Sequence, residues 1–193
     1  MARPVQFKHE DVLDSAMQIF WKQGYAATSV TDLIAATKLK PGSLYAAFKS
    51  KEGLFLAALD HYGERSAERI RQTLANADSP LAGIRGYFHQ MARSAADSTA
   101  QHSCFLVNTA LELARNDEVV REHVNRYFDR IENLFLDALV AARKNGELAP
   151  EKDPAALATF LMSGIWGLRV LEGTHPTQER AAVVVEQLLQ QLE

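Results

Sequence analysis

Residues 28–54 constrain the fold of this chain more than any other stretch. They read TSVTDLIAATKLKPGSLYAAFKSKEGL, and two short apolar patterns meet there at a turn. The first pattern predicts a helix over residues 30–38, with Ser29 or Thr31 as its N-cap. Asp32 would lie in its first turn, where a carboxylate complements the positive end of a helix. The residues that share the apolar face of this helix are Val30, Leu33, Ile34 and Thr37.

The second pattern predicts a short helix over residues 41–48. Pro41 suits its first position, because proline lacks the amide hydrogen that would be unbonded there. Gly42 adds no bulk at the front end, so the backbone could approach a groove edge closely. Leu44 and Phe48, four residues apart, would pack inward. Two short helices joined in this way are typical of a helix-turn-helix that reads DNA.

The whole stretch resembles the DNA-binding signature of tetracycline-repressor-type (TetR family) transcriptional regulators, roughly T-S-V-x-D-I-A-x-A-A-G-V-S-x-G-x-L-Y-x-x-F-x-S-K-E-x-L. The chain departs from it at Lys38, where the family usually has Gly, and at Lys40, where it usually has Ser. A non-Gly residue at the turn would be strained if the left-handed conformation is needed there. The matching residues are Thr28, Ser29, Val30, Asp32, Ala36, Gly42, Leu44, Tyr45, Phe48, Ser50, Lys51, Glu52 and Leu54.

The resemblance implies a ligand-responsive DNA-binding regulator, and it alone favours repression over activation. The second helix would enter the major groove of double-stranded operator DNA, with lysines and helix ends on phosphates. Ser43 and Lys40 are candidates for base-edge or phosphate contact, and Lys51 is expected to hold the DNA backbone. The residues assigned to DNA are Thr28, Ser29, Lys40, Pro41, Gly42, Ser43, Tyr45 and Lys51.

Charge and length divide the chain into two expected domains. The net charge is −3, but residues 1–53 hold seven Lys and Arg against five Asp and Glu, a net charge of +2. Residues 54–193 hold fourteen against nineteen, a net charge of −5. We expect a helix-turn-helix DNA-binding domain at 1–53 and a helical effector-binding and dimerisation domain at 54–193.

Helical periodicity recurs along the rest of the chain, and no alternating strand pattern is present. The fold class is therefore predicted to be all-α with about nine helices: an N-terminal three-helix helix-turn-helix domain and a C-terminal helical domain. The further predicted helices cover residues 8–23, 51–74, 80–97, 104–114, a long segment ending at Asn145 and Gly146, 155–171 and 177–192.

The last two predicted helices carry more apolar surface than one packing contact would use. Ser163, Gly164 and Gly167 lie beside Trp166, and small residues allow two helices to approach closely. In the family that the chain resembles, two such helices from each subunit form a four-helix bundle. We expect a homodimer through these helices, because a palindromic operator requires two DNA-binding domains. The alternative is that the two helices form a purely internal core.

The C-terminal domain is expected to hold a mainly apolar cavity for a small-molecule effector, with few polar anchors. Asn108 and Glu112 lie four residues apart on one predicted helix and could be such anchors. Each expected wall residue could equally be plain core. The full set expected around the cavity is Phe88, Met91, Cys104, Phe105, Asn108, Glu112, Tyr127, Ile131, Met162, Trp166 and Arg169.

Cys104 is the single cysteine of the chain. Its position at the start of a predicted helix could lower the pKa of the thiol and make it reactive, although a buried structural cysteine is commoner. His102 is two residues away, but two ligands are too few for a metal site, so no metal and no cofactor are predicted. One cysteine excludes an intramolecular disulfide and suits a reducing cytosol.

Several functional classes lack their signatures in this sequence. We find no apolar run near the ~20 residues that span a bilayer and no signal peptide, so a cytoplasmic protein without a membrane partner is expected. The sequence has no H-E-x-x-H motif, phosphate loop, G-x-S-x-G or G-x-G-x-x-G motif, which argues against an enzyme. Two alternatives stay open: a nonspecific DNA-binding architectural protein, and a helical enzyme or carrier that uses the cavity itself.

Overall fold

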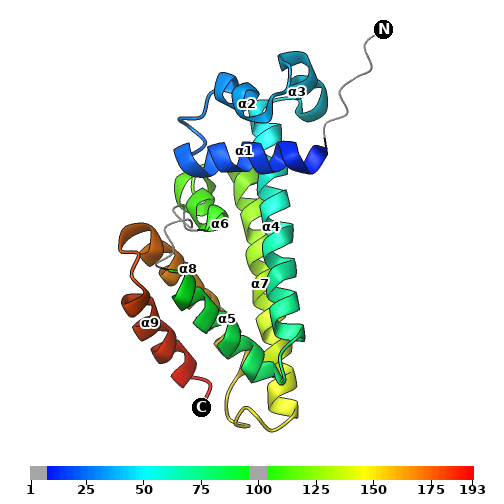
Figure 1. Cartoon of the computed structure of the whole chain (residues 1–193). Helices are drawn as coiled ribbons and strands as arrows, with labels where there is room; N and C mark the ends of the chain where they lie inside the picture. Colours follow the sequence, from blue (N-terminus) through cyan, green and yellow to red (C-terminus); the bar gives the residue numbers. More distant parts are fainter. Residues whose placement is uncertain (1–7, 96–103) are drawn as a thin grey trace.

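The computed structural model describes residues 8–95 and 104–193. Every regular element in those ranges is a helix (Figure 1), which confirms the all-α prediction. The elements are α1 (His9–Gln23), α2 (Val30–Thr37), α3 (Pro41–Phe48), α4 (Lys51–Ala75), α5 (Pro80–Ser94), α6 (Phe105–Thr109), η2 (Ala110–Ala114), α7 (Glu118–Lys144), α8 (Pro154–Thr174) and α9 (Gln178–Gln190).

One expected helix is interrupted. The stretch predicted as a helix over residues 104–114 begins as α-helix in α6 and continues as a π-helix in η2. A π turn widens the backbone ring by one residue, so it shifts the register of the residues that follow. His102, just before this segment, and residues 96–97, the predicted end of the helix over 80–97, lie outside the described residues.

Helices α1, α2 and α3 form a small head across one end of the long α4 (Figure 1). α1 is amphipathic, and its buried face points into the junction between head and body. Phe20 of α1 meets Phe55 of α4 edge to face, with ring centroids 5.0 Å apart. The buried face of α1 consists of Val12, Leu13, Ala16, Met17 and Phe20. The head is therefore packed onto the first turns of α4 rather than attached by a linker.

The body has two layers. α4 and α7 lie side by side along its length, and α5, α8 and α9 form the second layer (Figure 1). Gly63 allows the close approach of α4 and α7, because a Cβ at this position would lie 2.5 Å from ring atoms of Tyr127. Gly164 does the same between α8 and α9, where a Cβ would lie 2.6 Å from the methyl carbons of Leu188.

Helix α8 differs from one expectation of the sequence analysis. Its 21 residues are long and apolar enough to cross a membrane by length and composition, with a window of mean hydropathy 1.4. The expectation of no such run was wrong, because α8 combines large apolar residues and Ala with only two charged residues, Arg169 and Glu172. In this chain α8 packs against α7 and α9, and the rest of its apolar surface forms an exposed stripe.

Candidate nucleic-acid interface and ligand cavity

The start of α2 is fixed by a capping box. The Ser29 hydroxyl accepts the Asp32 N–H at 3.1 Å, and the Asp32 carboxylate accepts the Ser29 N–H at 2.9 Å. Ser29, rather than Thr31, is the N-cap. Hydrogen bonds from the Ser29 side chain and backbone lower the pKa of Asp32. The carboxylate is therefore ionised at neutral pH and holds the first turn of α2.

The turn between α2 and α3 contains a lysine in the left-handed conformation. Lys38 has φ 56° and ψ 18°, which is the conformation that the glycine usual at this place adopts easily. Leu39 is buried just after it and anchors the turn to the core. The strain that the sequence predicted for Lys38 is thus present, and its exposed side chain extends from the turn.

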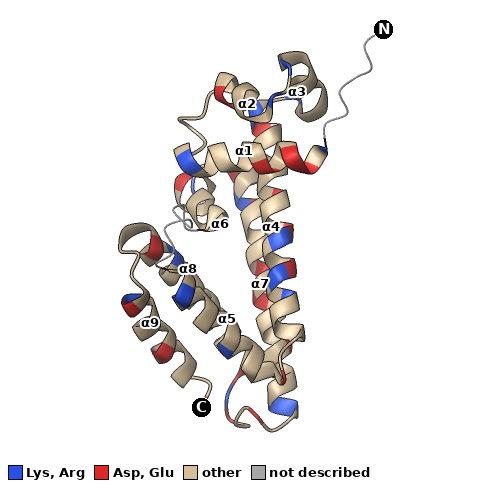
Figure 2. Cartoon of the chain, viewed as in Figure 1, with Lys and Arg blue, Asp and Glu red and all other residues tan. Residues whose placement is uncertain are grey.

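Helix α3 buries one face and leaves the other open. Leu44 and Phe48 are buried, as predicted. Along the described chain, Ser43, Tyr45 and the ammonium groups of the lysines at the α2–α3 turn have no side-chain hydrogen bond or ion pair. Figure 2 places Lys at this turn and next to α3. The exposed residues at the front of α3 are Lys40, Pro41, Gly42, Ser43 and Tyr45.

At the junction of α3 and α4 the N-cap is Ser50, as the sequence predicts, but sequence reasoning missed the role of Gly53. Ser50 caps α4, and its hydroxyl accepts the Gly53 N–H at 2.9 Å. A Cβ on Gly53 would collide with the carbonyl oxygen of Phe48. The angle between α3 and α4 therefore needs glycine at position 53. The signal was a glycine in the first turn of a helix, a place where glycine has no intrinsic advantage.

Two of the eight residues assigned to DNA are engaged inside the protein. Thr28 is 2% exposed, and its hydroxyl donates to the Gly24 carbonyl at 2.6 Å, so it braces the α1–α2 loop. The Lys51 ammonium lies 4.3 Å from the centroid of the Tyr25 ring, a cation–π contact. The other six, Ser29, Lys40, Pro41, Gly42, Ser43 and Tyr45, are exposed on the head. Of these, the Ser29 hydroxyl is engaged in the capping box with Asp32.

Comparison with known proteins fixes the family. Residues 12–58 match the model of bacterial regulatory proteins of the tetR family, and residues 80–188 match the tetracyclin repressor-like C-terminal domain. The chain belongs to the TetR family. This TetR-family chain is a DNA-binding transcriptional regulator of a family whose members act as dimers and respond to ligands. Its relatives are regulators rather than enzymes.

Similar proteins match over nearly the whole TetR chain. The HTH-type transcriptional repressor ComR of Escherichia coli K12 is 32% identical over 87% of this chain and 80% of its own. The repressor DhaR of Mycobacterium sp. GP1 is 26% identical over 98% and 95%. The TetR-family regulator CifR, solved in complex with 26-base-pair double-strand operator DNA, is 32% identical over 97% and 98%, with a TM-score of 0.87.

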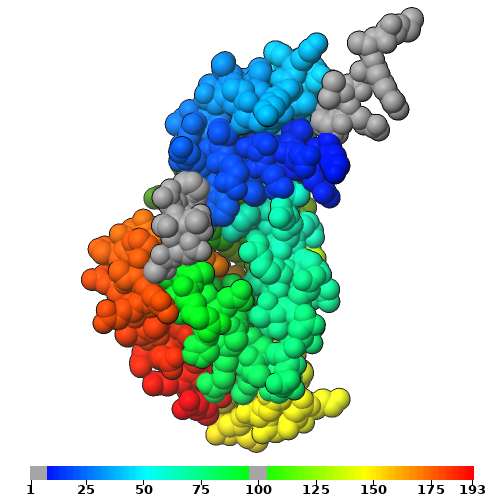
Figure 3. Space-filling model, viewed as in Figure 1, coloured from blue at the N-terminus to red at the C-terminus, as the bar shows by residue number. Residues whose placement is uncertain are grey.

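A cavity lies where the head meets the body. It comprises two adjoining chambers of about 590 and 180 Å³ that share Arg69, Ser94 and Arg169. Figure 3 shows a recess between α4 and α5, below α1. The larger chamber is also lined by Asp14, Met17, Gln18, Trp21, Tyr62 and Arg65, and the smaller by Thr73, Tyr87, Gln90 and Met91. Its walls therefore come from α1, α4, α5 and α8.

Three arginines line this cavity, and two of them are paired. Arg65 donates to Asp14 at 2.6 Å, and Arg169 donates to Glu172 at 2.8 Å. Arg69 has no hydrogen bond or ion pair from its guanidinium within residues 8–95 and 104–193. The cavity thus carries one uncompensated positive charge among its described lining residues.

The phenols in the cavity are hydrogen-bond donors at neutral pH. Burial, together with the nearby Cys104, raises the pKa of Tyr62, and burial also raises the pKa of Tyr87. The Tyr62 hydroxyl donates to the Cys104 sulfur at 3.6 Å. Burial alone would lower the pKa of Arg169, but the neighbouring Tyr87 and other groups raise it, so the guanidinium stays charged.

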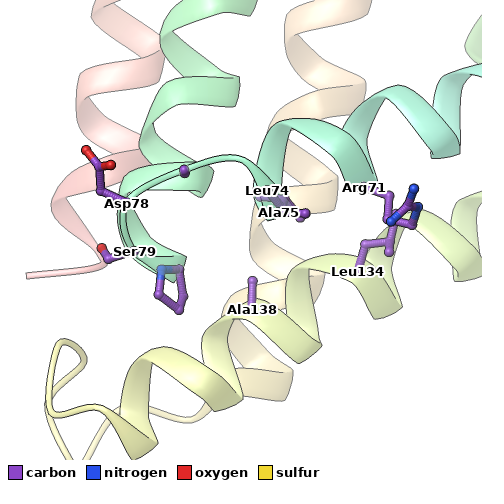
Figure 4. Close-up of a pocket in the computed structure, with 9 residues that line it drawn as sticks. Arg71, Leu74, Ala75, Asp78, Ser79, Leu134 and Ala138 are labelled. Atoms are coloured by element: carbon purple, nitrogen blue, oxygen red, sulfur yellow. The ribbon is translucent and has the colours of Figure 1, made fainter.

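A second hollow lies at the far end of the body. It has a volume of about 380 Å³ and is formed at the turn between α4 and α5 and the facing side of α7 (Figure 4). Its one cation, Arg71, is held by two hydrogen bonds to Glu68 at 2.8 and 2.7 Å. Its other polar lining residues are Ser79, whose hydroxyl donates to Glu147 at 2.6 Å, and the acidic Asp78. The hollow does not touch the head. It is therefore a weaker candidate than the cavity below α1.

The structure brings few of the expected effector residues to the cavity. Met91 and Arg169 line it, and Cys104 contacts it through Tyr62. Trp166 is 39% exposed and packs on Phe128 with centroids 5.2 Å apart. Asn108 is not among the residues that line either chamber. The remaining expected residues that are packed in the core are Phe88, Phe105, Tyr127, Ile131 and Met162.

Glu112 has a different position from the one expected. Its carboxylate accepts the backbone N–H of Tyr25 at 3.2 Å and of Ala26 at 3.1 Å, both in the α1–α2 loop. Gly24 leaves room for it, since a Cβ there would lie 3.0 Å from a Glu112 oxygen. Glu112 therefore ties η2 of the body to the head, and we call these two hydrogen bonds the Glu112 latch.

Proposed function

We propose that this chain is a homodimeric repressor whose two heads bind the half-sites of a palindromic operator, and that a small molecule in the cavity below α1 releases it. The observation that carries the proposal is the exposed front of α3. Its polar and cationic side chains have no partner in the described protein, while its other face is fixed in the core. Such a regulator would act on DNA in the cytoplasm.

The contacts to DNA follow from the geometry of the head. The front of α3 would enter the major groove, with Gly42 allowing close approach and Ser43 and Tyr45 reaching base edges or phosphates. Lys38 and Lys40 at the turn add charge on the same side, and the capped N-terminus of α2 at Ser29 suits a phosphate. Lys51 is retained as a phosphate contact that would have to leave the Tyr25 ring, at least in part.

The dimer would form through the exposed stripe of α8 together with α9. Phe160, Trp166 and Val170 are each about 40% exposed on α8. Trp166 and Val170 lie four residues apart on one side of an exposed face, Phe160 lies on the other side, and Gly167 lies between them. An exposed apolar stripe of this size costs solubility in a monomer unless a second subunit covers it. Val183 of α9 is 62% exposed and could extend the same contact.

Release would be a population shift. The cavity is walled by α1 of the head and by α4, α5 and α8 of the body. A ligand that fits one relative position of α1 and α4 better than another would favour that position, and the two heads would no longer match neighbouring grooves. Helix α4 runs from the head into the body, so it would transmit the movement.

Selection from a library of random double-stranded DNA tests operator recognition directly. The ligand-free protein should enrich an inverted repeat, and at ~0.15 M salt it should bind that repeat at least about a thousandfold more tightly than scrambled DNA. Substituting Ser43 and Tyr45 together by alanine should remove the preference. Enrichment of no sequence, with steep salt dependence, would favour a nonspecific DNA-binding protein instead.

A further inference from the structure

The charge balance of the cavity below α1 points to the kind of molecule it binds. Of its three arginines, Arg65 and Arg169 are neutralised by Asp14 and Glu172, and Arg69 is not. Arg69 lines both chambers, so its guanidinium is within reach of a ligand in either. Counted together with Glu172, which pairs with Arg169 just outside both chambers, the charged groups at the cavity leave a net charge of one positive unit. A guanidinium without a partner is suited to a planar carboxylate.

The other walls suit a flat apolar body. Trp21 and Tyr62 pack edge to face in the wall of the larger chamber, with ring centroids 5.3 Å apart. Met17 and Met91 add polarisable side chains that adapt to different ring shapes. The protonated phenol of Tyr87, with Gln90 and Ser94, supplies donors near the arginines. Aromatic and thioether walls around a cation favour a conjugated ring attached to an acid group.

We propose that the cavity binds a small aromatic or otherwise flat organic monoanion, with its carboxylate on Arg69 and its ring against the Trp21–Tyr62 pair and the methionines. This inference rests on the proposed function, since it specifies the ligand of the same effector site. A carboxylate brings these charged groups, Glu172 included, to neutrality. A phosphate monoester, which carries close to two charges at neutral pH, would leave an excess of negative charge beside Asp14 and Glu172.

A cationic ligand fits the same cavity less well. Aromatic rings attract cations, and Trp21, Tyr62 and Tyr87 could form part of such a cage. The two carboxylates beside this cavity, however, are already held by arginines, and Arg69 would repel an ammonium group. The Glu172 oxygen Oε1 is buried without a hydrogen-bond partner in the described protein, but Glu172 does not line either chamber.

Matched aryl compounds test the inference on the purified full chain without DNA. Benzoate, cinnamate and naphthoate are each compared with their neutral amide, their aminomethyl analogue and the corresponding aryl phosphate. Binding is measured by calorimetry and by quenching of Trp21 fluorescence in a Trp166→Phe background. At least one carboxylate should bind about tenfold or more tightly than its amide, its amine and its phosphate.

Two arginine variants on the same helix locate the site. Arg69→Gln should abolish the preference for carboxylate over amide, and Arg69→Lys should retain part of it. Arg71→Gln, the same change in the hollow of Figure 4, should have no effect on ligand binding. The proposal would be overturned if amides or amines bound as tightly as the acids, or if no carboxylate bound. Loss of the preference for carboxylate over amide in Arg71→Gln would overturn it as well. Operator selection uses ligand-free protein, so it can succeed when this experiment fails.

Discussion

At the scale of single residues, Lys38 and Lys49 have a strained backbone, one in each turn that flanks α3. Both have positive φ, 56° and 69°, which an L-residue adopts at a cost of roughly 1 kcal/mol. The family pattern predicted this strain at Lys38, because the pattern has glycine there. It did not reveal that Thr28 is buried, since a threonine before a helix serves equally well as a phosphate contact or as an internal brace.

Replacing Lys38 by glycine should stabilise the protein. Glycine adopts φ 56° without steric cost, so the free energy of unfolding should rise by about 0.5–1 kcal/mol. Urea denaturation measures this change. Lys40→Gly is the matched control, because Lys40 has φ −71° and glycine there should be neutral or destabilising. Equal effects of the two variants would show that the left-handed turn stores no strain.

Replacing Lys51 by alanine should weaken binding to all DNA sequences alike. A phosphate contact releases about one counterion, so the slope of log affinity against log salt should become shallower by about one unit. Fluorescence anisotropy with the selected operator at several salt concentrations measures the slope. Lys22→Ala, an exposed lysine at the end of α1, serves as the control. An unchanged slope would mean that Lys51 only packs on Tyr25.

At the scale of elements, the helices were predictable and the π turn was not. Apolar spacing located the helices because each buries one face. In the segment after Cys104, an α-helical register predicts that Asn108 and Glu112 share a face. The π-helix that begins at Ala110 changes that register, and Glu112 reaches the α1–α2 loop instead of a cavity. Nothing in the local sequence specifies a π turn, because its partner lies 86 residues away.

Removing the Glu112 latch should loosen the head from η2. Glu112→Ala leaves two backbone N–H groups without their acceptor, but the site is exposed, so the loss of stability should be only about 1 kcal/mol. The ligand-driven change in operator affinity should fall by about fivefold, because one connection between body and head is gone. Thermal denaturation and operator titrations with and without ligand measure the two effects.

Glu118→Ala is the matched control for the latch. Glu118 is also an exposed glutamate near η2, but its partner is Arg121 on the same helix, at 3.2 Å. Its removal should leave ligand response unchanged. If the ligand changes the operator affinity of Glu112→Ala and Glu118→Ala by the same factor, the latch does not couple ligand binding in the cavity to DNA binding by the head.

At the scale of the whole molecule, assembly should depend on the stripe of α8. Trp166→Glu places a charge in the proposed contact and should give monomers at micromolar concentration by light scattering. Operator affinity should fall by about a hundredfold or more, because each head then binds alone. Phe160→Glu should behave in the same way without disturbing Phe128. Leu111→Glu, at a 70% exposed site elsewhere, is the control and should stay dimeric.

The architecture of the whole could be predicted from the sequence, whereas the cavity could not. Periodicity and the family pattern are local signals, and they located both the head and the helical body. The cavity is a long-range product of packing: Trp21, Tyr62 and Arg69 come from α1 and α4, which looked like structural helices in the sequence. Residues expected as walls, such as Ile131 and Met162, became core because α7 and α8 pack directly together.

The contribution of α1 to the cavity has a consequence for engineering. Asp14, Met17, Gln18 and Trp21 belong to α1, which is part of the same head as α3. A hybrid that joins this body to a foreign head at residue 53 would lose those four side chains and with them one wall of the sensor. To keep its inducer, such a hybrid would have to retain this protein's first helix and graft only the residues from α2 to α3.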